Sequence, residues 1–132
     1  MDATTLKAWR KAERARLIAA RVALAPAVLD SWRRRMDVTL ERSFPGLARC
    51  RLAFCWPIKG EYDARHLART LRARGALTAL PVVVAPRTPL IFREWRPHCR
   101  MERGVWNIPV PADGEQLVPE VTIAPLVGYD PG

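Results

Sequence analysis

The sequence predicts an α/β domain, and three features of the 132-residue chain support this prediction. Its length suits a single domain over residues 1–132. Its 49% hydrophobic and 27% charged residues are typical of a globular protein and argue against disorder. The order strand, helix, strand between residues 51 and 84 is that of a βαβ unit, whose two strands pair in parallel.

The first predicted helix, residues 5–23, is strongly basic. It lacks Gly and Pro and is rich in Ala, Leu, Arg and Lys, and Thr4 or Thr5 can cap its start. Four cations recur there at helical spacing and share a face: Lys7, Arg10, Lys11 and Arg14. Like charges stacked in this way repel one another, so the face either meets water or binds an anion.

Positive charge is concentrated at the start of the chain. The net charge is +9, and residues 1–49 hold eleven basic and five acidic residues. Such a field attracts polyanions: nucleic acid, phosphates, acidic lipids or a polyglutamylated cofactor. A solvated, arginine-rich surface is the alternative explanation. Arg21 interrupts the apolar stretch at residues 17–29, which argues against a secretory signal peptide.

A second helix is predicted over residues 26–43, because Pro26 suits a first helical turn and the Pro45-Gly46 pair ends the pattern. The two helices form a basic N-terminal pair. In the second, a core-facing stripe is expected from helical spacing: Leu29, Trp32, Met36 and Leu40. The side facing water is then expected to hold Arg33, Arg34 and Arg35.

The βαβ unit follows as a strand at 51–56, a helix at 63–74 and a strand at 76–84. The first strand is a short apolar run, and the helix points Leu67 and Leu71 inward and ends at Gly75. Two more strands are predicted at 90–95 and 121–126, and residues 97–119 are expected to be mostly irregular.

The loop at residues 57–63 is the main candidate for a binding site. In an open α/β sheet, ligands bind beyond the carboxyl ends of the strands, where such loops gather. Glu61 and Asp63 could hold a cationic or NH-rich ligand, a metal ion or a proton. A cap on the following helix explains Asp63 better, so we expect ligand contact from Glu61. Trp106, in a Pro-rich loop, either plugs the core or walls a pocket for a flat ring.

The three cysteines, Cys50, Cys55 and Cys99, have irregular spacing. This pattern predicts neither a disulfide framework nor a zinc site and suits a reducing cytoplasm, where we expect the protein to reside. No apolar run approaches the ~20 residues needed to span a bilayer, so a membrane partner is not expected.

Several segments stand in a specific order along the chain. After the basic N-terminal helix come Pro57-x-x-Gly60-Glu61-x-Asp63, Leu80-Pro81-Val82-Val83, Leu90-Ile91-Phe92-Arg93-Glu94-Trp95, Arg103-Gly104-Val105-Trp106-Asn107-Ile108-Pro109-Val110-Pro111 and Ile123-Ala124-Pro125-Leu126-Val127-Gly128-Tyr129-Asp130. From about Leu6 to Gly132 this order resembles the 5-formyltetrahydrofolate cyclo-ligase family, also called 5,10-methenyltetrahydrofolate synthetase.

The resemblance implies an ATP- and Mg²⁺-dependent ligase of folate one-carbon metabolism. Such an enzyme converts 5-formyltetrahydrofolate, with or without a polyglutamate tail, to 5,10-methenyltetrahydrofolate. ATP phosphorylates the formyl oxygen, N10 attacks the activated carbon, and phosphate leaves. The implied fold is a Rossmann-like three-layer α/β/α sandwich. Neither a catalytic residue nor a metal ligand is identified in this chain.

The resemblance also implies roles for particular residues. It places a cationic helix face near the ATP phosphates: Lys7, Arg10, Lys11 and Arg14. Leu6 stands where the family usually has a lysine, and Lys7 follows one residue later. It assigns folate contacts to four residues, of which Trp106 borders the pocket: Ile58, Glu61, Asp63 and Trp106.

Family members continue past the Gly-Tyr-Asp segment into a Gly-rich motif that supplies backbone NH groups for phosphate and an Asp for Mg²⁺. This sequence stops at Gly132, so the resemblance implies a domain that is incomplete at its C-terminus. We therefore expect residues 1–132 alone to lack turnover, because several preorganised donors are missing together. We also expect self-association through the bare edge of the strand at 121–126.

Two alternatives to the enzyme remain open: a non-catalytic basic module for nucleic acid, and an inactive remnant that binds folate weakly. Nucleic-acid modules interleave exposed aromatic and basic residues. Here Trp9 lies beside Arg10, but the other tryptophans fall in strand ends, loops or the expected core stripe. No RNA or DNA motif matches, so nucleic acid is not the expected partner, and the oligomeric state is left undefined.

Overall fold

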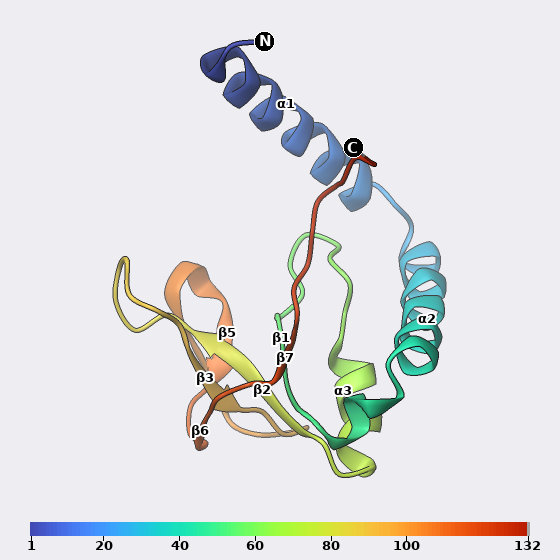
Figure 1. The fold of residues 1–132 in the computed structure, drawn as a ribbon, viewed down its shortest axis with the longest axis vertical. Helices are drawn as coiled ribbons and strands as arrows, with labels where there is room; N and C mark the ends of the chain where they lie inside the picture. Colours follow the sequence, from blue (N-terminus) through green and yellow to red (C-terminus); the bar gives the residue numbers. More distant parts are fainter. Residues whose placement is uncertain (132) are drawn as a thin grey trace.

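The computed structural model describes residues 1–131, with the helices mostly first and the strands later (Figure 1). The helices are α1 (Ala3–Val22), α2 (Pro26–Ser43) and α3 (Arg65–Ala73), and the 3-10 turns are η1 (Pro45–Arg49) and η2 (Val105–Asn107). The strands are β1 (Arg51–Phe54), β2 (Leu77–Val82), β3 (Ile91–Glu94), β4 (Met101–Arg103), β5 (Pro109–Pro111), β6 (Gln116–Leu117) and β7 (Val121–Ile123). The predicted α/β class and the N-terminal helical pair are confirmed.

Five strands form a mixed sheet in the order β6-β3-β2-β1-β7. β1 is parallel to β2 and β7, β3 is antiparallel to β2, and β6 is antiparallel to β3. Since α3 connects β1 to β2, the predicted βαβ unit is present, with Leu52 opposite Thr78. Residues 97–119, expected to be mostly irregular, also contain short strands, of which β4 and β5 form an antiparallel pair. Strands of two or three residues are too short to show a hydrophobic period.

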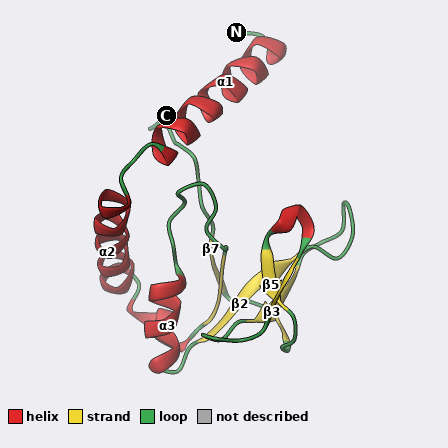
Figure 2. Ribbon diagram, turned by 180° about the vertical axis from the view of Figure 1, so that it is seen from behind, coloured by secondary structure: helices red, strands yellow, loops and turns green. Residues whose placement is uncertain are grey.

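The core lies where α3 meets the sheet. α2 and α3 lie together on one side of the sheet (Figures 1 and 2). Leu67 and Leu71 of α3 point inward as predicted and join Leu52 of β1 in a buried cluster. A second cluster contains Phe54 and Trp95, whose rings meet edge to face with centroids 5.2 Å apart. Both clusters contain residues of β1, which therefore holds the base of the following loop firmly.

α1 projects away from the sheet, and the last residues of the chain run back toward its final turn (Figure 1). It begins at Ala3, two residues before the predicted start, and Oδ1 of its N-cap Asp2 accepts a hydrogen bond from the Thr5 N–H at 2.7 Å. No residue of α1 is buried. Among residues 1–131, none of the helices is both long and apolar enough to cross a membrane.

The orientation of α2 differs from the sequence-based expectation. Trp32 and Met36, expected in the core, are 44% and 43% exposed. Arg33, expected in water, has only 15% of its side chain exposed. The reason is that α2 reaches the core near its end, at Leu40, whereas its first turns border a cavity.

Candidate functional site

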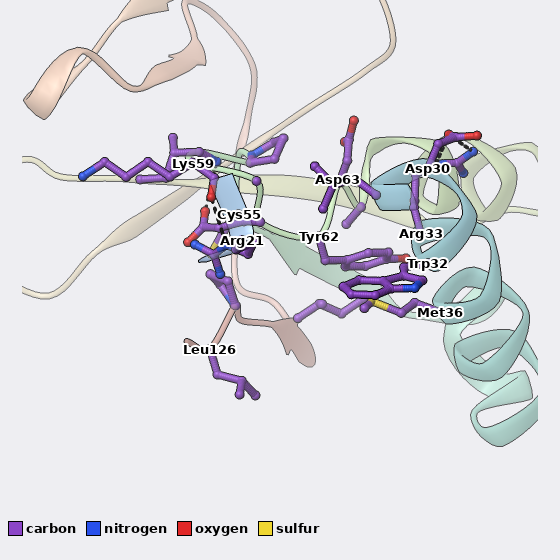
Figure 3. Close-up of a pocket in the computed structure, with 18 of the residues that line it drawn as sticks. Arg21, Asp30, Trp32, Arg33, Met36, Cys55, Lys59, Tyr62, Asp63 and Leu126 are labelled. Atoms are coloured by element: carbon purple, nitrogen blue, oxygen red, sulfur yellow. Dashed lines mark hydrogen bonds and ion pairs between the residues drawn. The ribbon is translucent and has the colours of Figure 1, made fainter. Parts of the chain in front are cut away.

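A cavity of about 730 Å³ lies beyond the carboxyl ends of the parallel strands β1 and β7. Its wall comes from the first half of α2, from the loop at 57–63 and from residues 123–127, and Arg21 of α1 completes it (Figure 3). The position agrees with the rule that predicted a site after the first strand. The volume is that of a small-molecule site, which is typically about 300–1,000 Å³.

The α2 side of the cavity is apolar and aromatic. Trp32, Met36 and Tyr62 gather there, and Arg21, Lys59 and Cys55 lie on the opposite side (Figure 3). Aromatic rings provide flat surfaces against which another planar ring can stack. The cavity therefore has one wall suited to a planar ligand and one wall that carries positive charge.

A hydrogen-bonded network holds Tyr62 in place. Its hydroxyl donates to Oδ1 of Asp37, whose Oδ2 accepts from Nη1 of Arg33 at 2.7 Å. Arg33 also donates from Nε and Nη2 to Oδ1 of Asp30, at 3.1 and 2.9 Å. Burial, together with the bond to Asp37, raises the pKa of Tyr62 well above its usual value, so the phenol stays protonated. The hydrogen bond from Arg33 lowers the pKa of Asp30, which therefore presents a carboxylate at the cavity.

The loop at 57–63 folds into a tight turn. The Glu61 N–H donates to the Ile58 carbonyl at 3.0 Å, and the two central residues, Lys59 and Gly60, have φ angles of 48° and 75°. Two left-handed residues are characteristic of a type I′ turn, and glycine suits the second. Oε1 of Glu61 accepts from the Ile58 N–H at 3.0 Å. One oxygen of this carboxylate is thus engaged by its own loop.

Asp63 lies just before α3 and contacts its first residue, but the predicted N-cap role is wrong because Ala64 is the N-cap. Its Oδ1 accepts from the backbone N–H of Arg65 at 3.1 Å, and its carboxylate also accepts two hydrogen bonds of 2.8 Å from the Arg65 guanidinium. Burial opposes ionisation, but these bonds from Arg65 lower the pKa of Asp63 below its usual value. The guanidinium also lies over the Trp56 ring, 4.5 Å from its centroid. Asp63 is therefore held at the start of α3 while it lines the cavity.

The structure brings together three of the four residues assigned to folate, since Ile58, Glu61 and Asp63 all line the cavity. Trp106 does not. It lies in η2, between β4 and β5, with 83% of its surface exposed and with φ at 56°. Its role at the border of a folate pocket stays a prediction.

The four residues assigned to ATP are exposed on α1 and are not among the residues of the cavity wall: Lys7, Arg10, Lys11 and Arg14. In the described chain none of the four forms an ion pair. Their phosphate contact stays a prediction. The same helix contributes Arg21 to the wall, a residue that the sequence marked only as a break in an apolar run.

Other ligating or reactive groups at the cavity are few. Burial, assisted by the nearby Glu61, raises the pKa of the Cys55 thiol, which disfavours the nucleophilic thiolate. Nε2 of His66 lies 3.7 Å from Oδ2 of Asp63. Within residues 1–131 no group of three His, Cys, Asp or Glu side chains is placed to hold a metal ion.

The fold is similar to that of two solved structures. The NMR structure of Aquifex aeolicus 5,10-methenyltetrahydrofolate synthetase matches with a TM-score of 0.68 and 22% identity, over 81% of this chain and 54% of that chain. The 5,10-methenyltetrahydrofolate synthetase from Mycoplasma pneumoniae matches with a TM-score of 0.54 and 18% identity, over 64% of this chain and 52% of that chain. The chain thus spans about half the length of these synthetases. No protein-family model and no curated protein matches the sequence.

Proposed function

We propose that the cavity binds 5-formyltetrahydrofolate and that the protein acts in its ATP- and Mg²⁺-dependent conversion to 5,10-methenyltetrahydrofolate, in the cytoplasm. One observation carries the proposal. The loop at 57–63, which the sequence motifs associate with folate, forms one wall of a cavity of suitable size beyond β1 and β7. The fold shared with two synthetases supports the same assignment.

The two sides of the cavity match the two ends of a folate. A pterin ring is flat and rich in N–H groups, so it would lie against Trp32 and Tyr62 and direct its donors to the carboxylates of Asp30 and Glu61. The glutamate end is anionic, and a polyglutamate tail more so. It would leave the cavity on the side of Lys59, where positive charge favours it.

ATP supplies the phosphoryl group in this reaction, and the exposed cations of α1 fit its phosphates. Lys7, Arg10 and Arg14 carry no ion pair in the described chain, so their charge is available to an anion. Mg²⁺ commonly keeps several waters and binds through substrate phosphates with one or two carboxylates. The nucleotide itself would therefore supply part of the metal coordination.

Replacing Glu61 by glutamine tests the folate assignment. Gln keeps an amide oxygen for the Ile58 N–H but removes the charge that strengthens a hydrogen bond from an N–H-rich ring. We expect the dissociation constant of 5-formyltetrahydrofolate to rise about fivefold, which corresponds to about 1 kcal/mol, with little change in thermal stability. Isothermal titration calorimetry measures the first quantity, and thermal unfolding measures the second.

The matched control is Glu102→Gln, which makes the same chemical change on β4, outside the cavity wall. Glu102 lies 4.0 Å from Arg93 in an exposed pair, so its loss is expected to be nearly neutral. Equal folate affinity in the Glu61 and Glu102 variants would remove Glu61 from the binding site.

Replacing Arg10 by alanine tests the nucleotide assignment. We expect the dissociation constant of ATP to rise by about fivefold at most, because a contact between exposed charges is worth about 1 kcal/mol or less. The wild-type affinity should also fall as ionic strength rises. Arg69→Ala, which removes an exposed cation from α3, is the control. If both variants bind ATP equally well, Arg10 belongs to a solvated surface.

A further inference from the structure

The last turns of α1 contact two separate walls of the cavity. On one wall, Nε of Arg21 donates a hydrogen bond to the Lys59 carbonyl at 2.9 Å, drawn as a dashed line in Figure 3. On the other, α1 approaches the segment that follows β7 so closely that a Cβ added to Gly128 would lie 2.8 Å from Cδ1 of Leu17. Residues 123–127, just before this contact, line the cavity. The end of α1 therefore bridges both walls.

The Arg21 contact acts on the most constrained part of the loop. Lys59 has φ at 48°, a conformation that is uncommon for a residue with a Cβ. Its neighbour Gly60 lies so close to α1 that an added Cβ would be 3.2 Å from Cγ of Arg21. The hydrogen bond to the Lys59 carbonyl stabilises this turn, which also positions Glu61. The orientation of α1 and the shape of the loop are thus linked.

The rest of α1 has no buried residue that would fix its orientation relative to the sheet. The helix has 20 residues, none of them buried, and it projects away from the sheet (Figure 1). A helix behaves as a rigid rod over such a length, about 30 Å. A nucleotide held on the face of Lys7, Arg10 and Arg14 that also reached the substrate in the cavity would fix the orientation of the rod, and with it the position of Arg21.

We propose that Arg21 is a positioning residue that couples nucleotide binding on α1 to folate binding in the cavity. The inference rests on the proposed function and adds to it a positive cooperativity between the two substrates. Each ligand restricts the same junction between α1 and the loop, so the second ligand has less disorder to remove. Because binding free energies are reciprocal, each ligand tightens the other by the same factor.

The experiment measures this factor by calorimetry. 5-Formyltetrahydrofolate is titrated into the full 132-residue protein with and without a saturating non-hydrolysable ATP analogue and Mg²⁺. In the wild type we expect the nucleotide to lower the folate dissociation constant about fivefold or more. In Arg21→Ala the ratio should fall to near one, although folate still binds. Arg21→Lys, whose ammonium can still donate to a carbonyl, should keep part of the coupling.

Arg16→Ala is the matched control, since it removes a cation from the same helix, and the partner of Arg16 is Glu13, also on α1. Its coupling factor should equal that of the wild type. A wild type that binds folate equally well with and without nucleotide would overturn the inference, as would unchanged coupling in Arg21→Ala. If the wild type binds no folate, the proposed function itself fails, and this inference with it. Should Arg21→Ala unfold, Arg21→Lys decides. A coupling factor below that of the wild type supports the inference, and a factor equal to that of the wild type overturns it.

Discussion

Replacing Trp32 by alanine is expected to weaken the binding of 5-formyltetrahydrofolate about 30-fold or more. The side chain lies on the cavity wall beside Tyr62 and Met36 (Figure 3). Large aromatic side chains at the centre of a binding site commonly contribute about 2 kcal/mol or more, because they exclude water from a broad flat contact. Since Trp32 is 44% exposed, its loss removes little core packing. Thermal unfolding should therefore change much less than affinity.

Trp9→Ala is the control for this prediction, because Trp9 is also an exposed tryptophan, 54% accessible, but lies on α1 outside the cavity wall. Calorimetric titration of both variants compares them directly. Equal affinities, or a larger loss in the Trp9 variant, would place the folate site elsewhere.

Replacing Arg72 by methionine is expected to lower the free energy of unfolding by about 3 kcal/mol. Nη2 of Arg72 lies 3.1 Å from Oε1 of Glu94, whose side chain is 9% exposed, and Nη1 donates to the Thr78 hydroxyl and the Trp95 carbonyl. Removing one partner of a buried ion pair costs about 3–5 kcal/mol because the other charge loses its compensation. We expect the lower end of this energy range, because Arg96 still forms an ion pair with Glu94 at 2.9 Å in the variant.

The decrease of the unfolding free energy at acid pH provides a second readout for the Arg72 variant. Burial opposes ionisation of Glu94, but hydrogen bonds from Arg96 and Arg72 lower its pKa below 4.5. Its contribution is therefore full above about pH 4.5 and is lost as the pH falls through the lower pKa of the folded state. Denaturant unfolding at several pH values should show a flatter acid limb in the Arg72 variant. Arg100→Met, which removes an exposed partner of Asp113, is the control and should change stability by less than about 0.5 kcal/mol.

The βαβ unit and the location of the cavity were predictable from sequence, because both follow from local patterns. The apolar run before residue 57, Gly75 after the helix and the inward spacing of Leu67 and Leu71 specify the unit. The rule for carboxyl ends of strands then places a site at the following loop. The cap predicted at Asp63 was displaced by one residue, because α3 begins at Arg65 with Ala64 as its N-cap.

The tertiary part of the site was not predictable. Helical spacing groups Trp32 and Met36 with Leu40 on one face, but it does not say that this face meets the core only near the end of the helix, at Leu40. Arg33 is mostly covered because Asp30 and Asp37 neutralise its charge, whereas the apolar stripe alone places it on the side facing water. The contact of Arg21 with Lys59 joins residues 38 apart in sequence, so no local pattern reports it.

Chemical-shift mapping of the 132-residue protein with 5-formyltetrahydrofolate tests the central claim most directly. If the cavity is the folate site, the largest perturbations should fall on the Trp32 indole N–H and on the amides of Gly60 and Tyr62, with saturation at one folate per chain. The indole N–H of Trp95, which is buried in the core and is not part of the cavity wall, should move little in the same titration. Perturbations confined to Trp9 and the cationic face of α1, or no perturbation at saturating folate, would contradict the assignment.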